Sequence, residues 1–214
     1  MPATRRTAFA HTAAGFVQDL YGPTGHSYTH ERYLNASRIW GDPTFASNAA
    51  CQAVHGSADD AWMCLTPQYV YPYIQTPVFV LAAGYDEGLA GGDIGVKCKP
   101  AFSPSCTPVD KAYWEYYRAN TSAHLQAAFD STRDGLFLDA CCPHCQSLTN
   151  GHANTWTGVT IGGVSPADGF DAWLTGGAAA AGAKSRDAQP YPSNPSCVGM
   201  GGARDVGVVP VEMY

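Results

Sequence analysis

The clearest hydrophobic pattern in the chain is an unbroken apolar run, Val78–Leu81, which is followed by Ala-Ala-Gly-Tyr-Asp. Apolar runs that do not alternate with polar residues are typical of strands buried on both faces, as in parallel sheets. A second run, Gly135–Leu138, and a weaker apolar segment, Thr7–Val17, have the same character. We therefore expect three buried strands. The strand nearest the N-terminus, within Thr7–Val17, is expected to end near Gly15.

Helical patterns lie between these runs. Thr107 and Pro108 are suited to a helix N-cap and first turn, and the helix is predicted to continue through WEYYRANTSAHLQAAF. Ser165 and Pro166 predict the start of another helix, which ends near Leu174. The order strand, helix, strand around Thr107 indicates a crossover between parallel strands.

The other segments have weaker signals. Ser47–Met63 is predicted to be helical with a cysteine near each end, whereas Tyr21–Pro43 is rich in polar residues and predicts a loop. Gly176–Gly182 is rich in glycine and alanine and predicts a flexible connection. Because no repeat or linker divides the chain, we expect one domain over residues 1–214.

Composition narrows the class of protein. The chain has 45% hydrophobic residues, a net charge of −6 and no basic patch, so a nucleic-acid partner is not expected. No window is apolar enough for a membrane span. Eight cysteines and two glycosylation triplets, at Asn35 and Asn120, predict a secreted, extracellular protein. The first residues lack a signal peptide, so we expect the chain to begin inside a longer protein.

The segment FLDACCPHCQ concentrates candidate chemistry. A zinc site there would be built from Cys141, Cys142, His144 and Cys145. Four ligands within five residues cannot readily surround one tetrahedral ion, so we expect no metal and no cofactor. His144 is then either a polar loop residue between disulfides or a catalytic base.

The position of His144 favours a base. Functional groups gather at the carboxyl ends of adjacent parallel strands, and Asp86 follows one predicted strand while His144 follows another. Acid before base is the chain order of an α/β-hydrolase triad. Asp86 would fix the tautomer of His144, whose other nitrogen would remove a proton from a serine hydroxyl. Glu87 is a rival acid beside Asp86.

Several segments together resemble the pectinacetylesterase and Notum family of carboxylic-ester hydrolases. They are CQAVHGSADDAWMCLTPQYV, YIQTPVFVLAAGYDEGLA, GLFLDACCPHCQS, NTWTGVTIGGVSPADGFDAW and PYPSNPSC. The resemblance covers most of residues 14–197. It implies the C-terminal part of an α/β-hydrolase-like parallel sheet with helical crossovers and disulfide-bearing loops. It also implies that Asp86 is the acid and His144 the base. Because Gln189 and Ser193 stand where the family has cysteines, the family's disulfide pattern does not carry over whole, and we expect only the local pairs Cys51–Cys64 and Cys98–Cys106.

The nucleophile does not carry over. The family has its serine in a Gly-x-Ser-x-Gly segment well before the acid, and no such pentapeptide occurs among the 85 residues before Asp86. The segment around Ser57 is similar but lacks the second glycine, so we reject Ser57. We therefore expect the chain to carry the acid and base without the serine, and to be inactive alone.

The resemblance implies a secreted esterase that removes acyl groups, above all acetyl, from a cell-wall or extracellular polysaccharide. Its partner is the acylated substrate, and the full-length protein is expected to be a monomer. The alternative is a catalytically inactive secreted module that binds a glycan or a protein through a disulfide-bearing scaffold.

Overall fold

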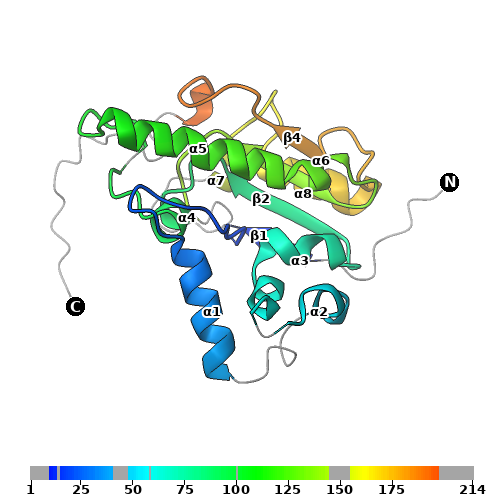
Figure 1. Ribbon diagram of the computed structural model, residues 1–214. Coiled ribbons are helices and arrows are strands. Elements are labelled where there is room, and N and C mark those ends of the chain that lie inside the picture. Colours follow the sequence, from blue (N-terminus) through cyan, green and yellow to red (C-terminus); the bar gives the residue numbers. More distant parts are fainter. Residues whose placement is uncertain are drawn as a thin grey trace, which may run out of the picture.

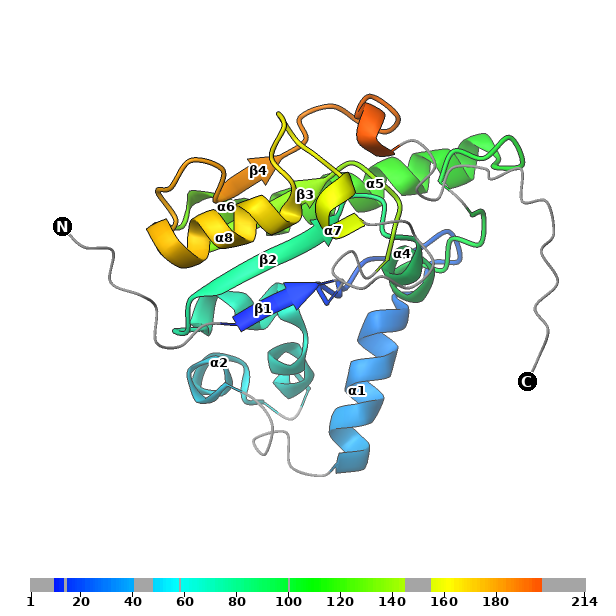
Figure 2. The same cartoon turned by 180° about the vertical axis from the view of Figure 1, so that it is seen from behind.

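The computed structural model describes residues 10–13, 15–40, 48–57, 59–99, 101–144 and 155–197. Within them, four parallel strands form one sheet in the order β1-β2-β3-β4, with helices on both faces (Figure 1, Figure 2). The strands are β1 (Ala10–Ala13), β2 (Val78–Ala83), β3 (Gly135–Asp139) and β4 (Lys184–Arg186). The three predicted strands are therefore present and parallel.

Helices occupy the connections between strands. The α-helices are α1 (Tyr28–Trp40), α2 (Ala49–His55), α3 (Pro67–Val70), α4 (Glu87–Asp93), α5 (Pro108–His124), α6 (Gln126–Asp130), α7 (Thr155–Gly158) and α8 (Pro166–Gly176). Short 3-10 helices are η1 (Ala61–Leu65), η2 (Tyr71–Tyr73) and η3 (Pro195–Cys197). Across the described ranges, none of the helices has the length and apolar character that crossing a membrane requires.

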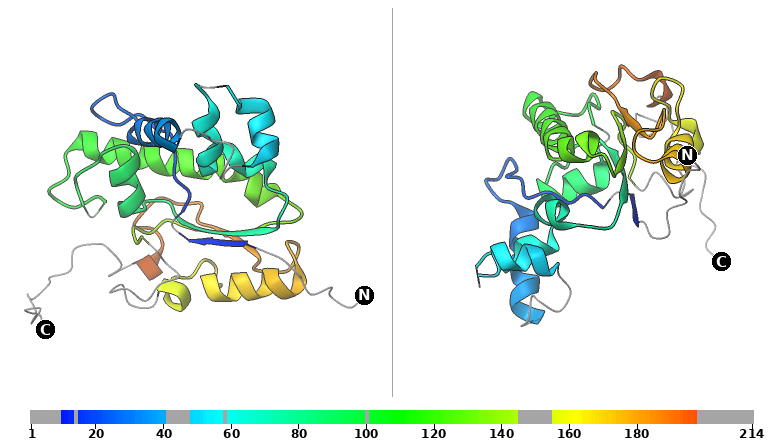
Figure 3. Two further views of the ribbon diagram at one scale, coloured as in Figure 1. Left: turned by 90° about the horizontal axis from the view of Figure 1, so that it is seen from below. Right: turned by 90° about the vertical axis from the view of Figure 1, so that its right-hand side faces the viewer.

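Both faces of β2 are covered, which explains its unbroken apolar sequence. Successive side chains of a strand point to opposite faces. Val80 packs in one cluster with Leu125 and Ala128, whereas Phe79 packs in another with Trp173 of α8. Figure 3 (left) shows α7 and α8 on one side of the sheet and α5 and α6 on the other. The result is a three-layer arrangement in which the strand ends remain available for a site.

The crossover from β2 to β3 is confirmed, with one difference. Thr107 caps α5 through a reciprocal capping box with Asp110, as the sequence predicts. The predicted continuous helix is interrupted at Leu125, where α5 ends and α6 begins. Leu125 is fully buried against β2 and β3. The residue at the break between the two helices therefore still packs in the core.

The loop prediction for Tyr21–Pro43 is wrong, because α1 occupies most of it. Ser27 lies at the start of this helix, where its hydroxyl accepts a hydrogen bond from the amide of His30 at 3.1 Å. Most described side chains of α1 are exposed or half-exposed, so no apolar stripe marks the helix in the sequence. The sequence feature that indicates this helix is its capping residue, Ser27.

The strand β4 was also missed. Its residues, Lys-Ser-Arg, have no apolar pattern, and it is defined by parallel pairing with β3. The preceding segment is not a flexible connection but a pair of hydrogen-bonded turns, in which Ala180 donates to Gly177 and Ala183 donates to Ala180, each at 3.1 Å. These turns lead the chain directly into β4.

Candidate active site

Asp86 lies just past the carboxyl end of β2, where it caps α4. Its Oδ1 accepts hydrogen bonds from the backbone amides of Gly88 at 2.9 Å and Leu89 at 2.8 Å. Only 1% of the residue is exposed. Because two amides and the surrounding protein fix the carboxylate, it cannot rotate away from the edge of the sheet. This is the position that the sequence predicted.

His144 follows β3, the neighbouring strand, and contacts Asp86. Its Nδ1 lies 2.8 Å from Oδ1 and 3.1 Å from Oδ2 of the carboxylate. A carboxylate accepts hydrogen bonds, so Nδ1 carries the proton and Nε2 carries the lone pair when the ring is neutral. The two predicted residues are therefore brought together in the geometry that an acid–base pair needs.

The two members of the pair differ in exposure. The Asp86 side chain is 2% exposed, whereas that of His144 is 41% exposed, so the imidazole can reach a substrate that approaches from solvent. The hydrogen bond to Asp86 raises the pKa of His144 above its usual value, although partial burial and the charge of Lys99 act in the opposite direction. The bond thus strengthens the base while leaving it accessible.

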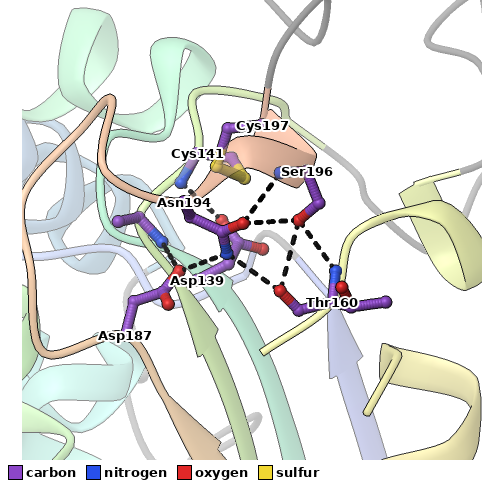
Figure 4. The surroundings of a disulfide bond; sticks show 8 residues. Asp139, Cys141, Thr160, Asp187, Asn194, Ser196 and Cys197 are labelled. Carbon is purple, nitrogen blue, oxygen red and sulfur yellow. Dashed lines mark hydrogen bonds between the residues drawn. A yellow bond between two sulfur atoms is a disulfide. The ribbon is translucent and has the colours of Figure 1, made fainter. Parts of the chain in front are cut away.

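The loop between β3 and His144 is held by a disulfide. Cys141, three residues before His144, is bonded to Cys197 of η3. Figure 4 shows hydrogen bonds around this disulfide, in which the amide of Cys141 donates to Asp139 at 2.8 Å and the side chain of Asn194 donates to Asp187 at 2.8 Å. The same Asp187 oxygen accepts from the amide of Ala140 at 2.9 Å. Segments distant in sequence therefore anchor the base-bearing loop.

Glu87, the rival acid, forms no hydrogen bond or ion pair with His144 among the described residues. Its Oε1 is buried and has no hydrogen-bond partner among the described residues. Burial raises the pKa of Glu87 to about 7. A carboxyl group that is partly protonated near neutrality and is not hydrogen-bonded to the imidazole is poorly suited to orient it. The geometry favours Asp86, as the sequence analysis did.

The cysteines around His144 have separate roles. Cys141 is committed to its disulfide, and Cys142 is a buried thiol whose pKa is raised by burial. Cys145 lies outside the described residues. No group of three or more metal-ligating side chains occurs within the part of the chain that the structure describes. Both expected local disulfides, Cys51–Cys64 and Cys98–Cys106, are present.

Ser57 belongs to the segment between α2 and η1. Its hydroxyl donates to Asp60 Oδ2 at 2.9 Å, in the turn that follows α2. Helix α2 lies near the start of β2, whereas α4 begins where β2 ends (Figure 1). Ser57 thus follows a helix near the opposite end of β2 from α4, and its rejection as a nucleophile stays a prediction.

Gly88 is a site residue that sequence reasoning missed. A Cβ atom on this residue would stand 2.5 Å from Cγ and 2.6 Å from Nδ1 of His144. Carbon atoms cannot approach this closely, so the imidazole packs against α4 only because residue 88 has no side chain. The sequence feature that indicates a close approach to this helix is its high glycine content, Gly-Leu-Ala-Gly-Gly.

Gly88→Ala in the full-length protein should lower kcat on a neutral aryl acetate by roughly 10–100-fold, because displacing the base by about 1 Å has an effect of that size. The helix itself should gain stability, since alanine is the better helix former. Gly92→Ala is the matched control, because its Cβ would meet only the guanidinium of Arg32, at 3.8 Å. Equal kcat values for the two variants would show that Gly88 does not position the imidazole.

The arrangement defines a class of protein. A carboxylate and an imidazole at the carboxyl ends of adjacent parallel strands, in that chain order and on a sheet covered by helices, correspond to the α/β-hydrolases. The family model described as pectinacetylesterase matches residues 5–198. The chain belongs to the pectinacetylesterase family.

Individual relatives agree with this assignment. The chain is 29% identical over 170 residues to pectin acetylesterase 11 of Arabidopsis thaliana, covering 74% of this chain and 40% of that protein. It is 29% identical over 126 residues to pectin acetylesterase 7 of the same plant, covering 50% and 31% of the two chains. The chain therefore spans less than half the length of either relative.

The fold is similar to that of the Wnt deacylase Notum from Drosophila. The TM-score is 0.66 at 17% sequence identity, and the match covers 88% of this chain and 48% of the Notum chain. Sequence identity this low relates the two folds only. The α/β-hydrolase fold that the sequence predicted is confirmed.

Proposed function

We propose that this chain supplies the acid and the base of a serine-type carboxylic-ester hydrolase, with Asp86 as acid and His144 as base. The observation that carries the proposal is their 2.8 Å contact at the carboxyl ends of β2 and β3. The contact fixes one tautomer of the imidazole and leaves Nε2 free to accept a proton. The chain is the C-terminal part of one α/β-hydrolase domain.

The reaction proceeds through an acyl-enzyme. Nε2 of His144 removes the proton from a serine hydroxyl, the serine oxygen attacks the ester carbonyl, and Asp86 stabilises the imidazolium. The bond between the carbonyl carbon and the sugar oxygen then breaks, and the imidazolium gives its proton to the departing sugar oxygen, which leaves as a hydroxyl. A water molecule, activated by the same nitrogen, releases the acid in the second half. The serine comes from a Gly-x-Ser-x-Gly segment of the longer polypeptide, and the 214 residues alone are inactive.

The substrate we propose is an acetylated cell-wall or extracellular polysaccharide. The names of the two plant relatives support acetyl as the acyl group and a pectic polymer as the carrier. The three disulfides among the described residues support secretion, because such bonds persist in oxidising compartments.

The test is to express the full-length gene product and measure hydrolysis of an aryl acetate, beside the 214-residue chain and a full-length His144→Ala variant. The full-length protein should turn over, and the other two should not. Absence of turnover by the full-length protein would overturn the esterase proposal and favour the inactive binding module. Turnover that survives His144→Ala would remove His144 from the mechanism.

A further inference from the structure

Helix α1 presents a continuous stripe of exposed side chains to solvent. Residues three or four apart lie on one face of a helix. The exposed residues with this spacing are Tyr28, Glu31, Arg32, Asn35, Arg38 and Ile39. Thr29 and Ser37, on the other side of the helix, are buried. Asn35 therefore stands in the middle of the solvent face of α1, with exposed neighbours one turn away in both directions.

Charges on both sides of Asn35 mark this face as one that stays in water. Glu31 and Arg32 lie one turn before Asn35, and Arg38 lies one turn after it. Glutamate and arginine side chains are almost never fully buried unless they are paired. The same face of α1 is therefore expected to remain in solvent when the rest of the longer polypeptide is present.

The second half of α1 leads away from the acid–base pair. The hydroxyl of Thr29 donates to Asp93, the last residue of α4, at 2.8 Å, and so ties the first turn of α1 to α4. From this point α1 leads away from α4 and from the sheet (Figure 1, Figure 2). Asn35 comes six residues after Thr29, which is about 9 Å along the helix axis. A bulky group on Asn35 is thus carried away from the helix that Asp86 caps.

The triplet Asn35-Ala36-Ser37 is an acceptor for N-linked glycosylation, and its three residues are oriented to suit a sugar on the first. Asn35 is exposed, whereas Ser37 is buried, and the Ser37 hydroxyl donates to the carbonyl of Leu34 at 2.8 Å. A glycan is bulky and requires a position on the surface. The folded helix therefore accommodates a sugar on Asn35 without moving a packed side chain.

The other triplet, which starts at Asn120, is part of the packing of α5. The Asn120 amide donates to the carbonyl of Tyr116 at 2.8 Å. Thr121 is 2% exposed, and its hydroxyl accepts from Gln18 at 2.7 Å and donates to the carbonyl of Tyr117 at 2.9 Å. A sugar on Asn120 would replace a hydrogen of an amide that is already bonded within the helix. Asn35 is therefore the better acceptor of the two.

Ile39 gives a glycan on Asn35 something to cover. Its side chain is 80% exposed, and it lies four residues after Asn35 on the same face of α1. Side chains of a helix tilt toward the N-terminus, so Ile39 leans back over the turn of Asn35. The first sugars attached to Asn35 would lie next to this apolar side chain and remove part of it from water.

We propose that Asn35 carries an N-linked glycan whose first sugars cover Ile39. The inference rests on the secretion proposed above, because the modification is added to chains that enter the secretory route. It assigns α1 a role separate from the chemistry of His144. The glycan prevents the apolar side chain from contacting other molecules and keeps the secreted protein monomeric.

The modification is tested on the full-length protein secreted from a mammalian cell line. Peptide:N-glycosidase releases the glycan and converts the asparagine that held it to aspartate, which peptide mapping locates. Position 35 should be aspartate in most molecules, and Asn35→Gln and Ser37→Ala should each remove the mass of one glycan. Unconverted asparagine at position 35 of the secreted protein would overturn the proposal.

Asn120→Gln is the matched control, because it destroys the other triplet and leaves Asn35 intact. The glycan on Asn35 should persist in this variant. Loss of all glycan mass in Asn120→Gln, with none lost in Asn35→Gln, would place the modification on α5 and refute the site on α1.

The covering of Ile39 has its own measurement. Light scattering at matched concentrations should show a shift of Asn35→Gln from monomer toward larger species, and Asn35→Gln/Ile39→Ser should return it to the monomer. Self-association that survives the removal of Ile39, or a variant Asn35→Gln that stays monomeric, would show that the glycan does not protect this side chain.

Hydrolysis of an aryl acetate separates this inference from the esterase proposal. Asn35→Gln should retain the kcat of the wild type per folded monomer, because Asn35 lies outside the acid–base pair. A glycosylated protein without turnover would refute the esterase proposal alone. An active esterase with bare Asn35 would refute the glycan alone.

Discussion

Asp86→Asn in the full-length protein should lower kcat on an aryl acetate by roughly 10⁴-fold, the loss typical when a triad carboxylate becomes an amide. The fold should persist, because asparagine is also a good helix cap and retains an oxygen for the amides of Gly88 and Leu89. The asparagine NH₂ would donate to Nδ1 of His144. The ring would then hold its proton on Nε2, where the lone pair is needed.

The pH profile of Asp86→Asn provides a second readout. The base works only when neutral, so kcat/KM rises as pH passes upward through the pKa of His144. The bond to Asp86 raises that pKa in the wild type. Removing the carboxylate charge should therefore move the acid limb of the residual activity to lower pH.

Glu87→Gln is the matched control for this substitution, because it neutralises the adjacent carboxyl without removing a hydrogen bond to His144. It should leave kcat and the acid limb nearly unchanged. A collapse of activity in Glu87→Gln, with Asp86→Asn still active, would reverse the assignment of the acid.

The strands and the acid–base pair could be predicted because their signals are local. The apolar runs before Asp86 and His144 mark strands buried on both faces, and parallel strands place their carboxyl ends at one edge. Two residues 58 positions apart could therefore be paired before any contact was known. Glu87 could not be excluded from the sequence, since the choice depends on which carboxylate turns toward the ring.

The missed features depend on tertiary contacts. Lys184–Arg186 becomes a strand only by pairing with β3, and its sequence has no strand pattern. The requirement for glycine at position 88 arises from the imidazole that packs on it. The connection between Cys141 and Cys197 spans 56 positions, and spacing alone does not select that partner for Cys141.

Removing the disulfide between Cys141 and Cys197 should have the largest effect on stability. Cys141→Ala/Cys197→Ala frees a loop of 56 positions, and chain entropy predicts a loss of about 4 kcal/mol in the free energy of unfolding. Both cysteines are fully buried, so the cavity adds to the loss. Because Cys141 lies three residues before His144, kcat per folded molecule should also fall. Denaturant unfolding and aryl acetate kinetics measure the two effects.

The Cys51→Ala/Cys64→Ala variant distinguishes a loss of protein stability from a displacement of His144. This disulfide spans 13 positions, so its removal should lower the free energy of unfolding by about 3 kcal/mol. It joins α2 to η1, near the start of β2 and away from His144, so kcat per folded molecule should be retained (Figure 1). Similar stability losses with unequal kcat would show that the Cys141 disulfide positions the base. Retention of kcat in both variants would mean that β3 and the hydrogen bonds of Asp187 and Asn194 hold the His144 loop without it.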